Sequence, residues 1–217
     1  MIDATTQQAI ADKIDRAVEA VLSKLRNHGG EEGITPVLGH ALMQQSFSAD
    51  GLTVDFNYRQ LSKQIEEPYA GADGGFLVRV STRTERVVKA SLFQAKLLPG
   101  SDAPRSLTIN KSAMTRLHEQ TRNMLKQSEQ SVAMFYTARN IYVVDAQKYS
   151  ESPPSGGGLP LGSGTRLITL GTYLGKWMPR CTKGDRNTDL ISRVEHLEGF
   201  RNGIDMHVVE ERPSIDW

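Results

Sequence analysis

Apolar and polar residues alternate along this chain in two rhythms, and each rhythm predicts one kind of element. Apolar side chains recur every three or four positions through residues 4–27, which predicts a long amphipathic helix. Further helices are predicted at 36–43, at 110–128, near 168–180 and near 187–199. Alternation with a period of two predicts strands, at 52–61, 75–81, 87–98, 131–137, 140–146 and 204–211.

Turn signals indicate where these elements begin and end. Thr35 followed by Pro36 predicts the N-cap and the first residue of the second helix. The charged residues 82–86 predict a hairpin, and the glycine-rich residues 152–165 are typical of a surface loop, with a substrate lid as the alternative. The order of the elements predicts an α/β or α+β fold, in which helices flank a central mixed sheet.

The composition narrows the class of protein. A chain of 217 residues, 38% of them hydrophobic and 24% charged, is typical of one globular domain. A net charge of +1 restricts polyanion binding to local patches. Cys181 is the only cysteine, which excludes an internal disulfide and fits a reducing compartment. Without a signal-like start or an apolar run of about 20 residues, we expect a cytoplasmic protein with no membrane contact.

The third predicted strand contains a lysine where an apolar residue is expected. Strand side chains alternate between faces, so Gln94 and Lys96 share a face with Leu92. Burying a lysine without a partner is costly. Asp73 stands between glycines just before the neighbouring strand. We therefore expect Asp73, Gln94 and Lys96 to meet in a polar pocket on one side of the sheet. The alternatives are that Asp73 caps a turn and that Lys96 extends from an edge strand into water.

The motifs GADGGF (71–76) and FQAK (93–96) resemble the PD-(D/E)XK nuclease superfamily. They are most similar to its Mrr-like restriction endonuclease branch, in which glutamine replaces the acidic residue of the (D/E)xK motif. The resemblance covers about 30–146, where it implies a restriction-endonuclease-like core. We expect a single nuclease-like domain over 1–217, with residues from about 150 to 217 as a C-terminal elaboration.

This resemblance implies phosphodiester hydrolysis with Mg²⁺, or Mn²⁺, as the cofactor. Asp73, the Ala95 carbonyl and Glu32 or Glu31, directly or through water, would hold the cation. The glutamates precede a helix, where its dipole favours acidic residues regardless of function, so a structural role is the alternative. Gln94 is neutral and leaves the site with one carboxylate fewer, and the proline that precedes the family's aspartate is absent.

Two further side chains complete the catalytic set that we expect. Lys96 would position or deprotonate the attacking water and offset negative charge that develops at phosphorus. Gln120 lies on the inward face of its predicted helix, where it is either a donor beside the site or a half-buried structural glutamine.

Basic residues would contact nucleic-acid phosphates, although a solvated surface is the alternative for each of them. The candidates are Arg79, Lys111, Arg116 and Arg122, together with Arg83, Arg86 and Lys89 around the hairpin. The resemblance implies a DNA endonuclease that acts in bacterial defence, with a homodimer formed through the first helix or a partner protein of the defence system. The alternatives are a catalytically impaired nuclease-fold subunit that binds or assembles, and an RNA-cleaving toxin.

Overall fold

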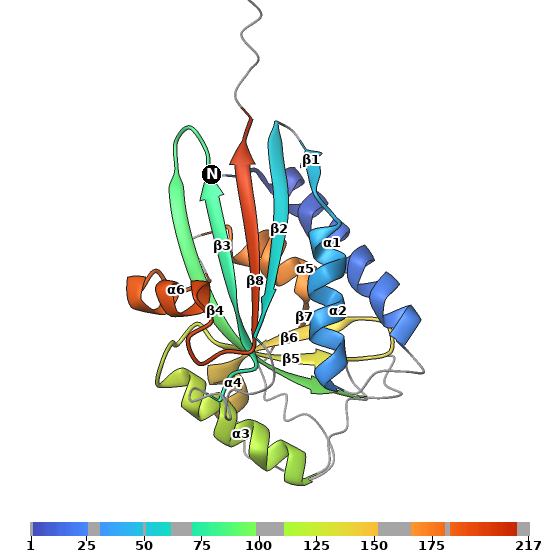
Figure 1. Ribbon diagram of the computed structural model, residues 1–217, viewed down its shortest axis with the longest axis vertical. Coiled ribbons are helices and arrows are strands. Elements are labelled where there is room, and N and C mark those ends of the chain that lie inside the picture. Colours follow the sequence, from blue (N-terminus) through green and yellow to red (C-terminus); the bar gives the residue numbers. More distant parts are fainter. Residues whose placement is uncertain are drawn as a thin grey trace, which may run out of the picture.

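A mixed sheet with helices on both faces organises the chain (Figure 1). The computed structural model describes residues 2–25, 31–49, 51–61, 71–98, 111–151, 166–180 and 183–211. The predicted loop or lid at 152–165 lies outside these residues. The predicted class, a central mixed sheet flanked by helices, is confirmed.

The elements follow the predicted order closely. The strands are β1 (Phe47–Ala49), β2 (Leu52–Gln60), β3 (Gly74–Ser81), β4 (Arg86–Leu97), β5 (Val132–Tyr136), β6 (Ile141–Asp145), β7 (Ile168–Thr169) and β8 (Asn202–Glu210). The helices are α1 (Ala4–Leu25), α2 (Glu31–Met43), α3 (Lys111–Leu125), α4 (Ala146–Glu151), α5 (Leu170–Thr172), the π-helical turn η2 (Tyr173–Trp177) and α6 (Thr188–Glu195). The helix predicted near 168–180 is thus replaced by a short strand, a single α-turn and a π-turn.

The strand order within the described part of the sheet is β1-β2-β8-β3-β4-β5-β6-β7. β3 and β4 form the predicted antiparallel hairpin, and β4 continues to the parallel β5 through the crossover helix α3. β8 comes from the end of the chain and lies between β2, to which it is antiparallel, and β3, to which it is parallel. A C-terminal strand therefore completes the middle of the sheet, beside the strand that follows Asp73.

One face of the sheet packs against α1, α2, α5 and η2 through the largest buried cluster. The apolar stripe of α1, which includes Ile10, Ile14 and Val18, belongs to that cluster. The apolar stripe of α1 therefore packs on the sheet within the chain, and the expected dimer contact through the first helix stays a prediction. The other face packs against α3 and α4 near β5 and β6, and against α6 near β3 and β4.

The predicted start of the second helix is also wrong. α2 begins at Glu31, so Thr35 and Pro36 lie inside it. The Thr35 hydroxyl forms a buried hydrogen bond of 2.7 Å with the Tyr136 hydroxyl instead of capping the helix. Tyr136 is the register partner of Leu97 at the end of β4. This contact therefore holds the first turns of α2 beside the end of the strand that carries Gln94.

Candidate active site

The loop before β3 runs through a space that only glycine permits. Gly71 has a φ of +69°, and a Cβ there would lie 2.9 Å from the backbone oxygen of Gln120 in α3. A Cβ on Gly74 would lie 2.4 Å from the backbone oxygen of Asn202 in β8. The glycines around Asp73 therefore let this loop lie between α3 and the inserted strand.

Beyond the N-terminal end of β3, Asp73 makes the hydrogen bonds to β4 that the backbone of a paired strand would otherwise make. Pairing between β3 and β4 ends at Gly74 and Phe93. One residue earlier, the Asp73 amide donates to the Phe93 carbonyl at 2.9 Å, and its carboxylate Oδ2 accepts from the Ala95 amide at 2.9 Å. The carboxylate thus satisfies a β4 amide that no strand reaches, and its position is fixed by main-chain geometry.

Gln94 joins Asp73 at this edge, as the sequence predicts. Its Nε2 donates to Asp73 Oδ2 at 2.6 Å and lies 3.3 Å from the carbonyl oxygen of Ala95. Both partners are acceptors only, so the amide must present its nitrogen to them and not its oxygen. A partially positive NH₂ group therefore lies beside a carboxylate and a carbonyl, which are the oxygen types that hold Mg²⁺ or Ca²⁺ in proteins.

Lys96 extends the same polar face towards the end of β4. Leu92 and Leu98 pack with the α6 and α3 clusters, whereas Phe93 and Ala95 pack in the α1 and α2 cluster. The alternation along β4 is therefore as predicted, and Lys96 lies on the α3 side with Gln94. Its side chain is half-buried.

Gln120 lies beside the loop that carries Asp73. Its backbone is next to Gly71, and its Oε1 is buried with no hydrogen-bond partner among the described residues. A buried acceptor without a donor is costly, so this oxygen is available to a water or ligand group near the loop. Its role at the site stays a prediction.

The expected glutamates can be followed only by their backbone. Glu31 and Glu32 form the first residues of α2, but their side chains lie outside the described residues. Within the described part of the chain, no group of three or more His, Cys, Asp or Glu side chains is arranged to hold a metal ion. The described donor set for a cation is therefore one carboxylate, one amide and one main-chain carbonyl.

Sequence reasoning missed the contribution of Asn202 to this site. Its Nδ2 donates to the Asp73 carbonyl at 3.0 Å, and its Oδ1 accepts from the Tyr58 hydroxyl at 2.7 Å. Both side chains are buried. No local pattern could reveal this, because the contact exists only where β8 enters the sheet beside β3.

The predicted nucleic-acid contacts differ in their surroundings. Lys111, Arg116 and Arg122 are exposed along α3, whereas Arg79 forms an ion pair of 2.7 Å with Glu195 in α6. Lys89 cannot contact phosphates, because its side chain is only 1% exposed. The Lys89 Nζ donates to the carbonyls of Met178 and Arg180 just after η2. Lys89 therefore holds residues 178–180 against β4, and its predicted contact with nucleic-acid phosphates is wrong.

A buried histidine also lies on α3. The pKa of His118 is lowered by burial and by the nearby Arg122, so the imidazole favours its neutral form. Its ring centroid is 4.7 Å from that of Tyr149 in α4. Neither His118 Nε2 nor the Tyr149 hydroxyl has a hydrogen-bond partner among the described residues.

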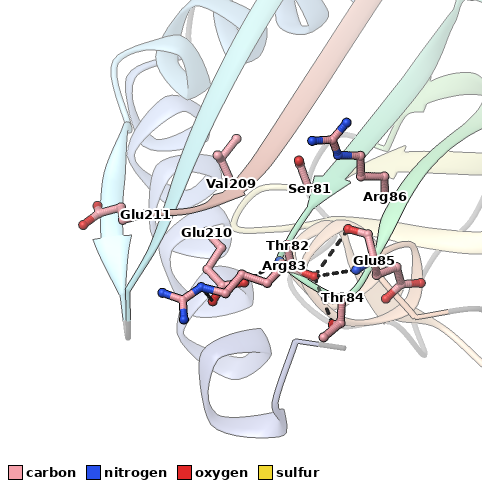
Figure 2. Close-up of a pocket in the computed structure, with 9 residues that line it drawn as sticks. All are labelled: Ser81, Thr82, Arg83, Thr84, Glu85, Arg86, Val209, Glu210 and Glu211. Carbon is pink, nitrogen blue, oxygen red and sulfur yellow. Dashed lines mark hydrogen bonds and ion pairs between the residues drawn. The ribbon is translucent and has the colours of Figure 1, made fainter. Parts of the chain in front are cut away.

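A separate pocket lies at the far end of β3, at the tip of the β3–β4 hairpin (Figure 2). Its lining comprises Ser81, Thr82, Arg83, Thr84, Glu85, Arg86, Val209, Glu210 and Glu211. The guanidinium of Arg83 forms an ion pair of 3.0 Å with Glu210, which joins the hairpin tip to the end of β8. The pocket is separated from Asp73 by the whole of β3, roughly 25 Å at about 3.3 Å per residue, so it is not part of the candidate site.

No helix in the described ranges is long and apolar enough to span a membrane. Comparisons of the chain with protein-family models, with curated proteins and with solved structures found no match.

Proposed function

We propose that this chain is a metal-dependent nuclease that hydrolyses phosphodiester bonds in DNA, with Mg²⁺ or Mn²⁺ as its cofactor. The observation that carries the proposal is the Gln94 amide nitrogen, which lies 2.6 Å from the Asp73 carboxylate and 3.3 Å from the Ala95 carbonyl oxygen. A donor that serves two acceptors in this way occupies a position where a cation is also favoured. The motif resemblance points to the same chemistry.

The donor set fits a divalent cation in part. Asp73 Oδ2 and the Ala95 carbonyl would be ligands directly, and Gln94 would turn its amide to present Oε1. When bound, the ion would polarise the phosphate and lower the pKa of a coordinated water. Glu31 or Glu32, the first residues of α2, would supply a second carboxylate.

Lys96 supplies the positive charge that hydrolysis requires. Attack of a water oxygen on phosphorus forms one P–O bond and breaks one ester P–O bond; the proton lost by the water passes to solvent, and the leaving ester oxygen takes up a proton. The Lys96 ammonium would hold that water and stabilise the charge that develops on the phosphate oxygens. The half-buried end of β4 reduces solvent screening of this interaction.

A plasmid assay tests the proposal. The purified chain with Mg²⁺ or Mn²⁺ should nick or cut supercoiled plasmid, and Asp73→Asn or Lys96→Met should reduce the rate at least a thousandfold. Lys126→Met, at an exposed position in the turn that follows α3, is the matched control and should keep the parental rate. Equal rates for the parent and the two site variants would overturn the assignment. Structured RNA in a parallel reaction distinguishes an RNA-cleaving enzyme.

A specific observation also favours a second function, a nuclease-fold subunit that binds nucleic acid without turnover. Gln94 is neutral, and its amide and the Ala95 amide already donate to the Asp73 carboxylate, so this carboxylate is stabilised without a second carboxylate or a cation. This subunit would bind DNA but would release no product at any Mn²⁺ concentration. A role in defence against foreign DNA rests on the motif resemblance for either function.

A further inference from the structure

The Asp73 backbone is also held by β8, the strand that lies on the opposite side of β3 from β4 and Gln94. Asn202 is the first residue of β8 and is paired in register with Gly74. Its Nδ2 donates to the Asp73 carbonyl at 3.0 Å. That carbonyl can only accept, so the orientation of the Asn202 amide is determined, and its Oδ1 must receive a donor from elsewhere.

Tyr58 is that donor. Its hydroxyl lies 2.7 Å from Asn202 Oδ1, and burial raises the pKa of Tyr58 to about 12, so the hydroxyl remains protonated at neutral pH. The Tyr58 ring is itself fixed under α2. A Cβ on Gly39 would lie 2.2 Å from it, and the ring of His40 packs edge-on against it with the centroids 5.1 Å apart.

We propose that Tyr58 and Asn202 are positioning residues that set the Asp73 carboxylate against Gln94 and the free edge of β4. Each link of the chain Tyr58–Asn202–Asp73–Gln94 is a hydrogen bond of 3.0 Å or less between groups of fixed donor and acceptor sense. Without the tyrosine hydroxyl, Asn202 Oδ1 is a buried acceptor with no donor. Its amide is then free to rotate, and the Asp73 backbone loses its support.

The inference extends beyond the proposed catalytic residues, because neither Tyr58 nor Asn202 touches the cation or the substrate. Both are buried among apolar side chains and reach the site only through Asp73. They also connect α2, which carries Glu31 and Glu32 at its start, to the aspartate on the other side of β8. Mutation of a residue that makes an outer hydrogen bond of this kind typically lowers metal affinity or activity about 10–100-fold.

Tyr58→Phe tests the inference, because it removes one oxygen and keeps the ring. Tyr173→Phe is the matched control, since that buried hydroxyl also makes one hydrogen bond of 2.7 Å, to Ser91 Oγ, away from Asp73. The first measurement is the NMR signal of the Gln94 side-chain NH₂, assigned by its loss in Gln94→Glu. We expect this signal to shift in Tyr58→Phe and to stay unchanged in Tyr173→Phe.

The second measurement is DNA cleavage, and this part rests on the proposed function. Tyr58→Phe should lower kcat about tenfold with little change in KM for DNA, whereas Tyr173→Phe should change neither. Asn202→Asp places an acceptor against the Asp73 carbonyl and should shift the Gln94 signal further. If the parent does not cut DNA, the proposed function fails, and the NMR comparison still decides the inference. A folded Tyr58→Phe with the parental Gln94 signal would overturn it.

Discussion

Replacing Gln94 with glutamate is the most informative perturbation of the site, because it changes an attraction into a repulsion at constant size. In the parent, the amide donates to a carboxylate oxygen 2.6 Å away. A carboxylate at the same position loses that charge-assisted hydrogen bond, worth about 1.5–3 kcal/mol. It also repels the Asp73 carboxylate by up to about 4 kcal/mol at a separation near 4 Å and an effective dielectric constant of about 20.

We therefore expect Gln94→Glu to lower the free energy of unfolding by about 3–5 kcal/mol in EDTA at pH 8. At roughly 2–4 °C per kcal/mol, the Tm falls by about 10 °C. A divalent cation should reverse the loss, since two carboxylates bind it more tightly than one. Binding at 100 times Kd contributes about 2.7 kcal/mol, so Mn²⁺ should raise the Tm of the variant more than that of the parent.

Thermal unfolding followed by circular dichroism, with and without Mn²⁺, measures both effects. Gln147→Glu, at an exposed position of α4, is the control and should change the Tm little in either condition. The difference in Tm between the parent and Gln94→Glu in EDTA should become smaller as the pH falls from 8 to 5, because one of the two facing carboxyls of the variant takes up a proton. A Tm in EDTA that matches the control would refute the contact between Gln94 and Asp73.

Two further predictions concern stability away from the site. Lys89→Met keeps the length of a buried side chain but leaves the carbonyls after η2 without their charged donor, so we expect a loss of about 2–5 kcal/mol in urea unfolding. Lys148→Met removes an exposed ion pair of 3.0 Å with Glu151 and should cost about 0.5 kcal/mol or less; equal losses would contradict the role assigned to Lys89. His118 has a lowered pKa in the folded chain, so the unfolded chain binds the proton first and the free energy of unfolding decreases as the pH falls below about 6.5. In His118→Phe this decrease should be smaller, and a profile parallel to the parent's would contradict the burial of a neutral imidazole.

Local patterns were enough to predict the pair at the centre of the site. Alternation along β4 places Gln94 and Lys96 on one face, and the eight residue pairs of the β3–β4 hairpin determine which β4 residue lies beside Asp73. Both are short-range features, set by strand periodicity and by a turn of known length. The contact at 2.6 Å between Asp73 and Gln94 was therefore accessible from the sequence.

Features that depend on long-range pairing were not accessible. Residues 204–211 read as a strand, but nothing in their alternation indicates that β8 would enter between β2 and β3. The role of Asn202 follows from that insertion and was missed with it. The Thr35-Pro36 signal was misleading for a related reason, because Thr35 uses its hydroxyl to bond Tyr136, 101 residues away in the sequence.

We propose that Asp73, Gln94 and Ala95 form one site for a divalent cation, and titration of the chain with Mn²⁺, followed by electron paramagnetic resonance, tests this directly. The parent should bind Mn²⁺, and Asp73→Asn, whose side-chain oxygen can still accept from the Ala95 amide, should remain folded and lose that binding at least tenfold. Equal Mn²⁺ affinity in parent and variant, or no binding by the parent, would contradict the claim.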